Sequence, residues 1–401
     1  MKICVIADDL TGAAEIAGIG HRYGLTTRLV RSGYVPSTAE LTVIDTDSRQ
    51  LAPAEAVVRV KQVVAEARST APADALFFKK IDSVLRGPLL AELDAAMDAL
   101  GKKCALLVPQ NPSRGRTIQA GRYAINGVAL DQTTFASDPD HPAKTDRVLD
   151  LLGTASHGKT VVLDPGSEVP ETGICVCGAA TPAEVASWAC QLDDETLPAG
   201  GADFFQAVLE DRGLKVAPPL AITGSEGKAL IVCGSASSPS RQAVERAEQE
   251  GLCICAMPDI LFTAASVEPN LVDAWSDDVV QAFETQRCVI IAARQPAGST
   301  PASSLTLASR FAEVVSQVAA RVKLGELLLE GGSTAAAVVN RLCWHEFFVC
   351  REAAPGVVQV LPAADRGPLI TFKPGSYPWP ETGFKQLSRN NTRQGGETER
   401  K

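Results

Sequence analysis

Short apolar runs alternate with helical patterns along most of the chain, and this alternation constrains the fold more than any other feature of the sequence. It is typical of βαβ units built on a mostly parallel sheet. In the first half, strands are predicted at residues 26–30, 41–45, 75–79, 104–108, 159–163 and 173–177, and helices at 53–68 and 88–100. The predicted fold class is therefore α/β.

A polar, glycine-containing segment at residues 222–228 interrupts the alternation, which then restarts. A chain of 401 residues is long enough for two domains. We predict two α/β domains with mostly parallel sheets, residues 1–225 and 226–385, and an active site in the cleft between them. Residues 386–401 are almost entirely polar and are predicted to form a disordered tail. Within the second domain, helices are predicted at 239–250, 277–285 and 303–322, and the last two strands at 346–350 and 368–372.

Charge and hydropathy exclude several classes of protein. The net charge is −9 with acidic and basic residues mixed along the sequence, so neither nucleic acid nor an anionic membrane surface is a predicted partner. No apolar run approaches membrane-spanning length, and the chain opens on a strand pattern rather than a signal peptide. We expect a cytoplasmic protein, and the sequence allows a homodimer without predicting one.

The eleven cysteines do not follow a metal-binding or disulfide pattern. Cys175 and Cys177, like Cys253 and Cys255, are two residues apart within strand-like runs, no CxxC pair occurs, and the total is odd. Buried free thiols are therefore predicted. Because the four histidines are scattered without ligand spacing, a zinc site is not predicted.

Two adjacent carboxylates mark the first candidate site. Asp8 and Asp9 follow the apolar run at residues 3–7 and precede an Ala- and Ile-rich helical pattern. In an open α/β sheet, ligands bind beyond the carboxyl ends of the strands, near the N-terminus of the following helix. We expect one aspartate to cap this helix and the other to be a functional acid.

Polar residues also follow the next two predicted strands. The segment IDTDSR, which ends at Arg49, is by itself typical of an ordinary capped turn. The segment KKIDSVLRG is the stronger signal, and it begins at Lys79 where an apolar strand ends. We expect one of its two lysines, Lys79 or Lys80, to be exposed.

The chemistry of this second segment suits a small hydroxy acid. Arg86 can grip a carboxylate through two hydrogen bonds, Lys80 adds a compact positive charge, and Asp82 can accept a hydrogen bond from a hydroxyl group. Ser83 lies between them in the sequence.

Residues 108–142 form a long polar stretch with little helical periodicity, which predicts a loop. Loops of this length inside a compact domain are usually functional or disordered, and the varied composition favours function. Arg114, Arg116 and Arg122 suit an anionic substrate or a transferred phosphate.

Two glycine-marked turns in the second half suit phosphate binding. The segment VCGSASSPSRQ at 232–242 and the segment LLLEGGSTAAAVVN at 327–340 each lead from a strand pattern through small residues into a helix pattern. Backbone N–H groups at such helix N-termini bind anions. Neither segment is a Walker A motif or a GxGxxG motif.

As a set, these motifs resemble the four-carbon acid sugar kinase family. The match rests on ADDLTGA, KKIDSVLRG, the GRT segment, GSASS, GGSTAAAV and LITFKPGS, which occur in the family's order and spacing over almost the whole chain. The resemblance implies that the N-terminal domain binds a small sugar acid and the C-terminal domain binds ATP. It also implies phosphorylation of a terminal hydroxyl group in the cleft between them, on threonate, 3-oxo-tetronate or a related short acid.

The resemblance also implies roles for individual residues. On the substrate side it places Asp8, Asp9, Arg49, Lys80, Asp82, Ser83, Arg86 and Arg116, of which Asp8, Asp9 and Arg86 are the catalytic candidates. On the nucleotide side it places Ser235, Ser237, Gly331, Gly332, Ser333, Thr334 and Gly375.

The mechanism that we expect is direct, in-line phosphoryl transfer. Mg²⁺ and backbone N–H groups would hold the ATP phosphates, while Asp8 or Asp9 would act as the base. Lys80 and Arg86 would fix the substrate carboxylate. The sequence does not assign ligands to the metal.

Two other classes of function stay open. One is a sensor that binds a sugar acid or a nucleotide without turnover. The other is a phosphatase with an aspartyl nucleophile, which fits less well: Asp8 and Asp9 are adjacent, and Arg49 stands where the Asp45–Asp47 segment would need Thr or Val.

Overall fold

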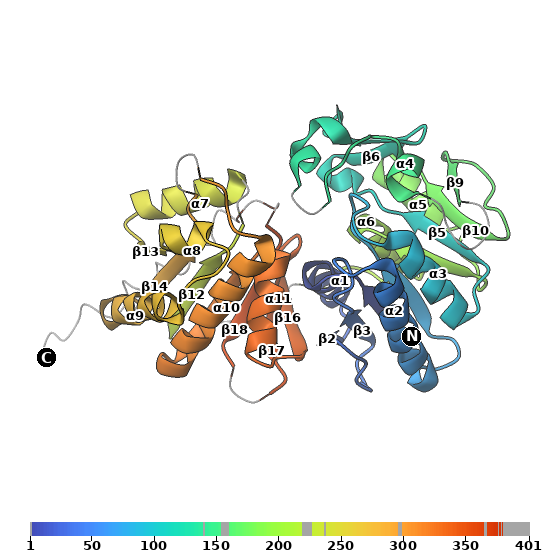
Figure 1. Ribbon diagram of the computed structural model, residues 1–401. Helices are drawn as coiled ribbons and strands as arrows, with labels where there is room; N and C mark the ends of the chain where they lie inside the picture. The colour runs from blue at the N-terminus through green and yellow to red at the C-terminus, as the bar shows by residue number, and fades with distance from the viewer. Residues whose placement is uncertain are drawn as a thin grey trace, which may run out of the picture. The chain divides into compact units, whose positions relative to one another are not determined.

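The computed structural model describes residues 2–138, 141–153, 160–218, 227–235, 238–295, 299–364, 367–375, 377 and 379. The chain divides into two compact units, Met1–Pro219 and Leu220–Lys401 (Figure 1). Each unit is an α/β fold with a mostly parallel sheet, which confirms the predicted fold class. The predicted domain boundary after residue 225 and the predicted tail at 386–401 lie outside the described residues.

The sheet of unit 1 is parallel throughout, with the strand order β2-β3-β1-β4-β11-β5-β10-β9. The strands predicted from the sequence are all present. Their bounds are β1 (Ile3–Ala7), β2 (Thr27–Arg31), β3 (Leu41–Asp45), β4 (Leu76–Lys80), β5 (Cys104–Val108), β9 (Thr160–Leu163) and β10 (Gly173–Cys177), and the sequence pattern does not predict β11 (Thr196–Gly200).

Helices cover this sheet in two groups. The helix α2 (Pro53–Thr70) packs against α3 (Leu89–Leu100), while α6 (Ala202–Asp211) packs against α1 (Leu10–Arg22) and α5 (Pro182–Ala189). Alternate strand residues point to opposite faces. Thus Phe77 joins the core cluster that includes residues of α2 and α3, whereas Phe78 lies 5.1 Å from the ring of Phe205 in α6. Both faces of the central strands are therefore buried.

The stretch at 108–142 is not the loop that the sequence predicts. It contains a small antiparallel sheet of β6 (Arg116–Gln119), β7 (Arg122–Ile125) and β8 (Val128–Ala129), together with 3₁₀ turns at Pro112–Arg114, Leu130–Gln132 and Thr134–Ser137. The strands are only two to four residues long, so they leave too short an alternation to read from the sequence. The short helix α4 (Val148–Leu152) follows.

Unit 2 has the strand order β13-β14-β12-β15-β18-β17-β16. The strands β13, β14, β12, β15 and β18 are parallel to one another. The strand β17 is antiparallel to both β18 and β16. The bounds are β12 (Lys228–Cys233), β13 (Cys253–Ala256), β14 (Cys288–Ala292), β15 (Leu324–Glu330), β16 (Glu346–Ala354), β17 (Val357–Pro362) and β18 (Leu369–Lys373). The helices are α7 (Ser238–Gln249), α8 (Asp259–Thr263), α9 (Pro269–Thr285), α10 (Ser304–Arg321) and α11 (Gly332–Arg341).

The strand order reverses beside the first strand of each unit. In unit 1 the chain places β2 and β3 on one side of β1 and then places β4 on the other side. In unit 2 it places β13 and β14 on one side of β12 and then β15 on the other. Ligands of open α/β sheets bind beyond the carboxyl ends of the strands at such switch points. The candidate binding sites therefore lie at the carboxyl ends of β1 and β4 in unit 1 and of β12 and β15 in unit 2.

All eleven cysteines are free thiols. Cys175 and Cys177 are buried as predicted, but Cys253 and Cys255 are only half-buried, because β13 is the edge strand of its sheet. The prediction of buried thiols is wrong for Cys190 and Cys343, which are exposed. Within the described residues, no helix has the length and apolar character needed to cross a bilayer.

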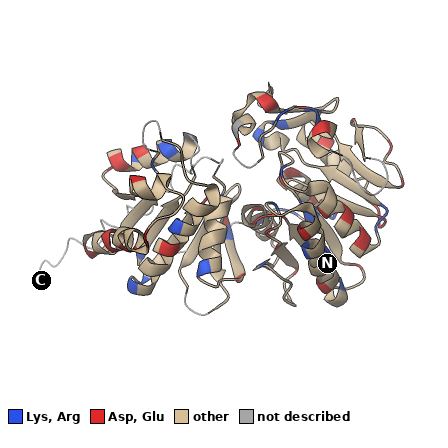
Figure 2. Cartoon of the chain, in the orientation of Figure 1, with Lys and Arg blue, Asp and Glu red and all other residues tan. Residues whose placement is uncertain are grey.

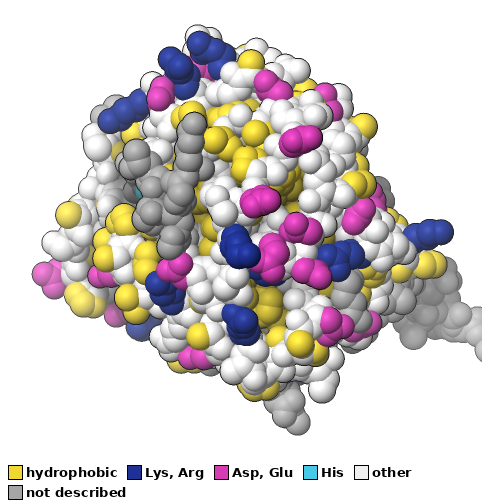
Figure 3. Space-filling model, turned by 90° about the vertical axis from the view of Figure 1, so that its right-hand side faces the viewer, with side chains coloured by type: hydrophobic (Ala, Val, Ile, Leu, Met, Phe, Trp, Pro, Cys, Tyr) yellow, Lys and Arg dark blue, Asp and Glu magenta, His cyan; other side chains and the backbone are white. Residues whose placement is uncertain are grey.

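Acidic and basic residues are spread over the helices and loops of both units (Figure 2). On the face drawn in Figure 3, side chains of the two signs lie interspersed with hydrophobic ones. This mixture agrees with the even distribution of charge along the sequence.

Candidate active site

The two aspartates after β1 both contact Arg49, but only Asp9 also bonds the first turn of the helix that follows. Asp9 is the N-cap of α1, where its Oδ1 accepts a hydrogen bond from Gly12 N at 3.0 Å and its Oδ2 accepts one from Thr11 Oγ1 at 2.6 Å. The expectation that one aspartate caps the helix is thus confirmed. Asp8 is instead held by Arg49, which comes from the turn after β3.

Arg49 contacts carboxylates that follow two neighbouring strands: Asp8 and Asp9 after β1, and Asp82 after β4, whose Oδ1 lies 3.7 Å from Arg49 Nη1. Its Nε donates to Asp8 Oδ2 at 2.7 Å, and its Nη2 donates to Asp8 Oδ1 at 2.9 Å and to Asp9 Oδ1 at 2.7 Å. Burial opposes the charge of Arg49, but Asp8, Asp9 and Asp82 outweigh burial and raise the pKa of Arg49. Burial likewise opposes ionisation of Asp9, but Arg49 and Lys80 outweigh it and lower the pKa of Asp9.

Arg86 holds Asp82 in the turn after β4. Its Nε and Nη2 donate to the two carboxylate oxygens of Asp82 at 2.8 and 2.9 Å, and its Nη1 donates to Asp138 Oδ2 at 2.9 Å. Burial opposes the charge of Asp82, but Arg86 and Arg49 outweigh it, so the pKa of Asp82 lies well below its usual value. This side of the site therefore carries permanently ionised groups of both signs.

Both lysines of β4 are buried, so the prediction that one of them is exposed is wrong. The exposed fractions are 0% for Lys79 and 4% for Lys80. Lys79 Nζ pairs with Glu92 of α3 at 2.6 Å, because successive residues of a strand covered on both faces point into opposite cores. Lys80 points to the other face, where its Nζ donates to Ile81 O at 2.8 Å and lies 3.9 Å from Glu15 Oε2.

The first turn of α1 approaches Lys80 closely. A Cβ atom built on Gly12 would lie 3.0 Å from Lys80 Nζ and 2.6 Å from Asp9 Oδ1. The missing side chain at Gly12 thus leaves room for the ammonium beside a helix N-terminus, an arrangement that attracts anions.

The small sheet supplies the remaining substrate-side residues. Arg116 Nη1 donates to Ser83 Oγ, and Tyr123 OH donates to Ser83 O at 2.6 Å. The Phe135 ring centroid lies 5.6 Å from the guanidinium carbon of Arg86 and 5.7 Å from that of Arg116. The small sheet therefore docks on the turn that follows β4.

The other two arginines of this segment differ in where they lie. Arg114 Nη2 is 3.6 Å from Glu15 Oε1, on the side of Lys80. Arg122 is 63% exposed and pairs with Asp146. Among the described contacts, only Arg114 and Arg116 reach the residues of the candidate site.

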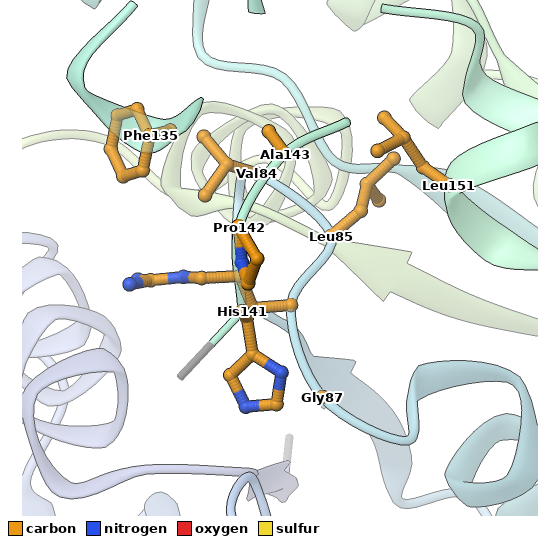
Figure 4. A pocket seen from close by; sticks show the side chains of 9 residues that line it. Val84, Leu85, Gly87, Phe135, His141, Pro142, Ala143 and Leu151 are labelled. Carbon is orange, nitrogen blue, oxygen red and sulfur yellow. The ribbon is translucent and has the colours of Figure 1, made fainter. Parts of the chain in front are cut away.

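A pocket of about 190 Å³ opens beside Arg86. Figure 4 shows the Phe135 ring on one side and the Leu85 and Leu151 side chains on the other, with Pro142 between them. Val84, Gly87, His141 and Ala143 complete the lining.

Three turns of unit 2 come together beyond the ends of β12, β15 and β18. A Cβ atom on Gly234 would lie 2.1 Å from Thr334 Oγ1, and one on Gly375 would lie 2.7 Å from Ser235 Oγ. Only glycine fits at such close approaches. The predicted residues Ser235, Thr334 and Gly375 are therefore neighbours, whereas Ser237 lies outside the described residues.

The N-terminus of α11 is a candidate anion site in the described part of unit 2. Gly331 is its N-cap with φ 92°, and no described side chain caps the helix. Gly332 and Ser333 form the first turn, and Ser333 is exposed. The first N–H groups of the helix can thus meet a phosphate.

Sequence reasoning missed several residues that shape these sites. In unit 1 these are Glu15 beside Lys80 and Asp138 beside Arg86. In unit 2 they are Glu330 and Lys373, which form a buried ion pair. Glu330 and Lys373 each sit at the last residue of a strand, and this position was the available signal.

Two family models match the chain. One is described as a sugar-binding N-terminal domain and covers residues 3–207, and the other is described as a nucleotide-binding C-terminal domain and covers residues 230–377. The class of protein is thus a two-domain α/β protein in which a sugar-binding domain precedes a nucleotide-binding domain.

Curated relatives extend over most of the chain. A D-threonate kinase from Salmonella typhimurium is 26% identical and the match covers 88% of this chain and 90% of the relative. A D-erythronate kinase from Heliobacterium modesticaldum is 28% identical, and the match covers 92% of this chain and 90% of the relative. A 3-oxo-tetronate kinase from Brucella melitensis is 25% identical, and the match covers 89% of this chain and 88% of the relative. The chain belongs to the four-carbon acid sugar kinase family, which confirms the resemblance carried by its motifs.

Solved structures share the fold. A crystal structure from Salmonella typhimurium LT2 has a TM-score of 0.77 at 18% identity and covers 97% of this chain and 99% of its own. A crystal structure of a Haemophilus influenzae protein has a TM-score of 0.69 at 20% identity, and the match covers 96% of this chain and 99% of the other.

Proposed function

We propose that this protein is an ATP-dependent kinase that phosphorylates a terminal hydroxyl group of threonate, 3-oxo-tetronate or a related short sugar acid. The observation that carries the proposal is that each unit has a chemically distinct site at its switch point. Unit 1 has carboxylates with buried cations, and unit 2 has glycine turns around an uncapped helix N-terminus. The family models for sugar binding and nucleotide binding fall on the same two units.

The residues of unit 2 suit the phosphates of ATP. Gly331, Gly332, Ser333 and Thr334 offer backbone N–H groups and hydroxyls, and Ser235 and Gly375 adjoin them. The described residues contain no cluster of three or more His, Cys, Asp or Glu side chains that could hold a metal. Mg²⁺ would be held mainly through the nucleotide phosphates, because it usually needs only one or two protein carboxylates. When bound, Mg²⁺ neutralises charge on the phosphates.

Unit 1 suits the acid substrate. Lys80 and the part-exposed Arg86 supply positive charge for its carboxylate, with Arg116 beside them. Asp82 and Ser83 can bond its hydroxyl groups, and Arg49 holds the two aspartates of the β1 turn in place.

Asp9 is the residue that we propose for the reacting hydroxyl. The hydroxyl oxygen forms a bond to the γ-phosphorus while the bond from that phosphorus to the β,γ-bridging oxygen of ATP breaks, so ADP leaves. Asp9 orients the hydroxyl and accepts its proton. In a loose transition state this proton leaves late, so a carboxylate of low pKa can serve.

The proposal is tested by ADP release from Mg-ATP with a panel of four-carbon and branched five-carbon sugar acids and their 3-oxo forms. Turnover that depends on one acid is the expected result. If the protein binds ATP but releases no ADP with any acid of the panel, the kinase proposal is contradicted and a non-catalytic sensor is favoured.

A further inference from the structure

A buried ion pair lies where three turns of unit 2 meet. Glu330 is the last residue of β15 and directly precedes the Gly331 turn, and Lys373 is the last residue of β18 and directly precedes the Pro374 turn. Lys373 Nζ lies 2.7 Å from Glu330 Oε1, and the exposed fraction of both side chains is 0%. The pair is therefore buried beneath the turns and is shielded from solvent.

Further contacts connect this pair to each turn. Lys373 Nζ also donates to Pro374 O at 3.0 Å, and the backbone N–H of Gly331 donates to Lys373 O at 2.9 Å. Ser240, in the first turn of α7, donates its hydroxyl to the second oxygen of Glu330. A shift of either charged side chain would thus move the chain segments after β12, β15 and β18 together.

Stability alone does not explain the pair. Removing two charges from water costs more than their attraction returns in many buried pairs, and apolar replacements are often as stable. Lys373 Nζ further lies 4.9 Å from the centroid of the Trp379 ring, so its positive charge is enclosed on that side as well. Because its partners belong to separate chain segments, an enclosed charge of this kind is suited to fixing the positions of those segments relative to one another.

We propose that Glu330, Lys373 and Ser240 are positioning residues for the nucleotide phosphates. They hold the Gly331 turn and the Pro374–Gly375 turn at the spacing that phosphate binding needs, and they touch neither the nucleotide nor the acid. The inference rests on the proposed function, since it requires that unit 2 bind the nucleotide.

The test compares variants of the full-length protein by calorimetric titration with Mg-ADP in the absence of acid. Lys373→Met alone leaves Glu330 charged and unpaired, so it can fail to fold. The double variant Lys373→Met with Glu330→Gln removes both charges and keeps an amide that can bond the Ser240 hydroxyl. We expect this double variant to melt near the wild-type temperature but to bind Mg-ADP about 10- to 100-fold more weakly, because a misplacement of about 1 Å has such effects.

Unit 1 offers a matched control, the buried pair of Lys79 and Glu92, which lie 2.6 Å apart. The double variant Lys79→Met with Glu92→Gln makes the same chemical change away from unit 2, and its affinity for Mg-ADP should equal that of the wild type. In the Lys373/Glu330 variant, the KM for ATP should rise while the KM for the acid stays within about twofold.

The outcomes separate this inference from the function on which it rests. A wild type that binds no Mg-ADP contradicts both. A wild type that binds Mg-ADP, with a folded Lys373/Glu330 variant that binds it equally well, overturns the positioning role and leaves the kinase proposal intact. Equal loss of affinity in the Lys79/Glu92 control would also overturn it, because the effect would then be a general one of lost stability.

Discussion

Asp8 and Asp9 are adjacent and chemically identical, but their surroundings differ. The exposed fraction of the side chain is 5% for Asp8 and 15% for Asp9. Both oxygens of Asp8 accept hydrogen bonds from Arg49, whereas Asp9 is held by the first turn of α1 and by one nitrogen of Arg49. Asp9 is thus the better placed of the two to meet a substrate hydroxyl.

Replacing Asp9 by Asn should lower kcat by about 10²- to 10⁴-fold, the usual contribution of a positioned acid–base group. Asn caps helices as well as Asp does but lacks the charge that Arg49 and Lys80 stabilise, so the midpoint of urea unfolding should fall while the protein stays folded. Steady-state kinetics with the preferred acid, together with urea unfolding, checks both expectations. Full turnover by a folded Asp9→Asn variant would remove Asp9 from the reaction.

Asp82 should make the stability of the protein depend on pH in the acid range. Its folded pKa lies well below the usual value, because Arg86 and Arg49 outweigh the effect of burial. Above the unfolded pKa of about 3.9, the stabilisation by Asp82 is fully present, and it is lost as the pH falls through the lower folded pKa. The unfolded state binds more protons in that window, so stability falls as the solution becomes more acidic.

The variant Asp82→Asn isolates this contribution. The difference in unfolding free energy between the wild type and the variant should be constant between about pH 5 and pH 7 and should shrink below about pH 4. Urea unfolding at a series of pH values measures it. A difference that grows toward acid pH would show that the folded pKa of Asp82 is raised instead.

At the scale of elements, the small sheet β6–β8 holds the turn after β4. Tyr123 of β7 is fully buried, and its hydroxyl bonds the backbone oxygen of Ser83 at 2.6 Å. Burial raises the pKa of Tyr123, so it stays a neutral donor. The position of Asp82, Ser83 and Arg86 thus depends on a sheet whose strands come from another part of the chain.

Replacing Tyr123 by Phe should lower the free energy of unfolding by about 1–3 kcal/mol, because the Ser83 carbonyl loses a buried partner. It should also raise the KM for the acid. The matched control is Tyr34→Phe, since the Tyr34 hydroxyl accepts from Thr70 at an exposed position, and it should cost less than about 0.5 kcal/mol. Equal effects of the two substitutions would contradict the docking role of the small sheet.

The elements also show how far the sequence could predict the fold. The apolar runs of β1 and β5 are evident because a parallel strand buried on both faces is apolar almost throughout. The strand β11 contains Pro198 and ends at Gly200, residues that argue against a central strand. It is nevertheless flanked by β4 and β5, so tertiary packing outweighs local preference there.

The candidate site was partly predictable for a similar reason. Asp8, Asp9, Lys80 and Asp82 lie next to strand ends, which a sequence pattern reveals. Burial is not revealed in this way, and Lys79 illustrates the limit: its partner Glu92 is thirteen positions away on a helix, so the pattern gave no sign of the ion pair.

At the scale of the whole molecule, we propose that unit 1 binds the acid and unit 2 binds the nucleotide. The cations that we assign to the acid belong to unit 1, and the turns that we assign to phosphate belong to unit 2. A substitution in one unit should therefore weaken the binding of that unit's ligand without weakening the binding of the other ligand.

Replacing Lys80 by Met should weaken acid binding by about 10- to 100-fold, because a hydrogen bond to a charged group contributes about 1.5–3 kcal/mol. The affinity for Mg-ADP should not change. Calorimetric titration of the same variant with each ligand makes the comparison. Loss of Mg-ADP binding in a folded Lys80→Met protein would contradict the assignment of the two ligands to separate units.

The central claim is transfer of a phosphoryl group from ATP to a sugar acid, and the most direct measurement is the balance of products. The wild type is incubated with Mg-ATP and the acid that gives turnover, and ADP, inorganic phosphate and the phosphorylated acid are quantified by ³¹P NMR. The account predicts one phosphorylated acid for each ADP and little free phosphate. ADP accompanied by an equal amount of inorganic phosphate, with no phosphorylated acid, would contradict it.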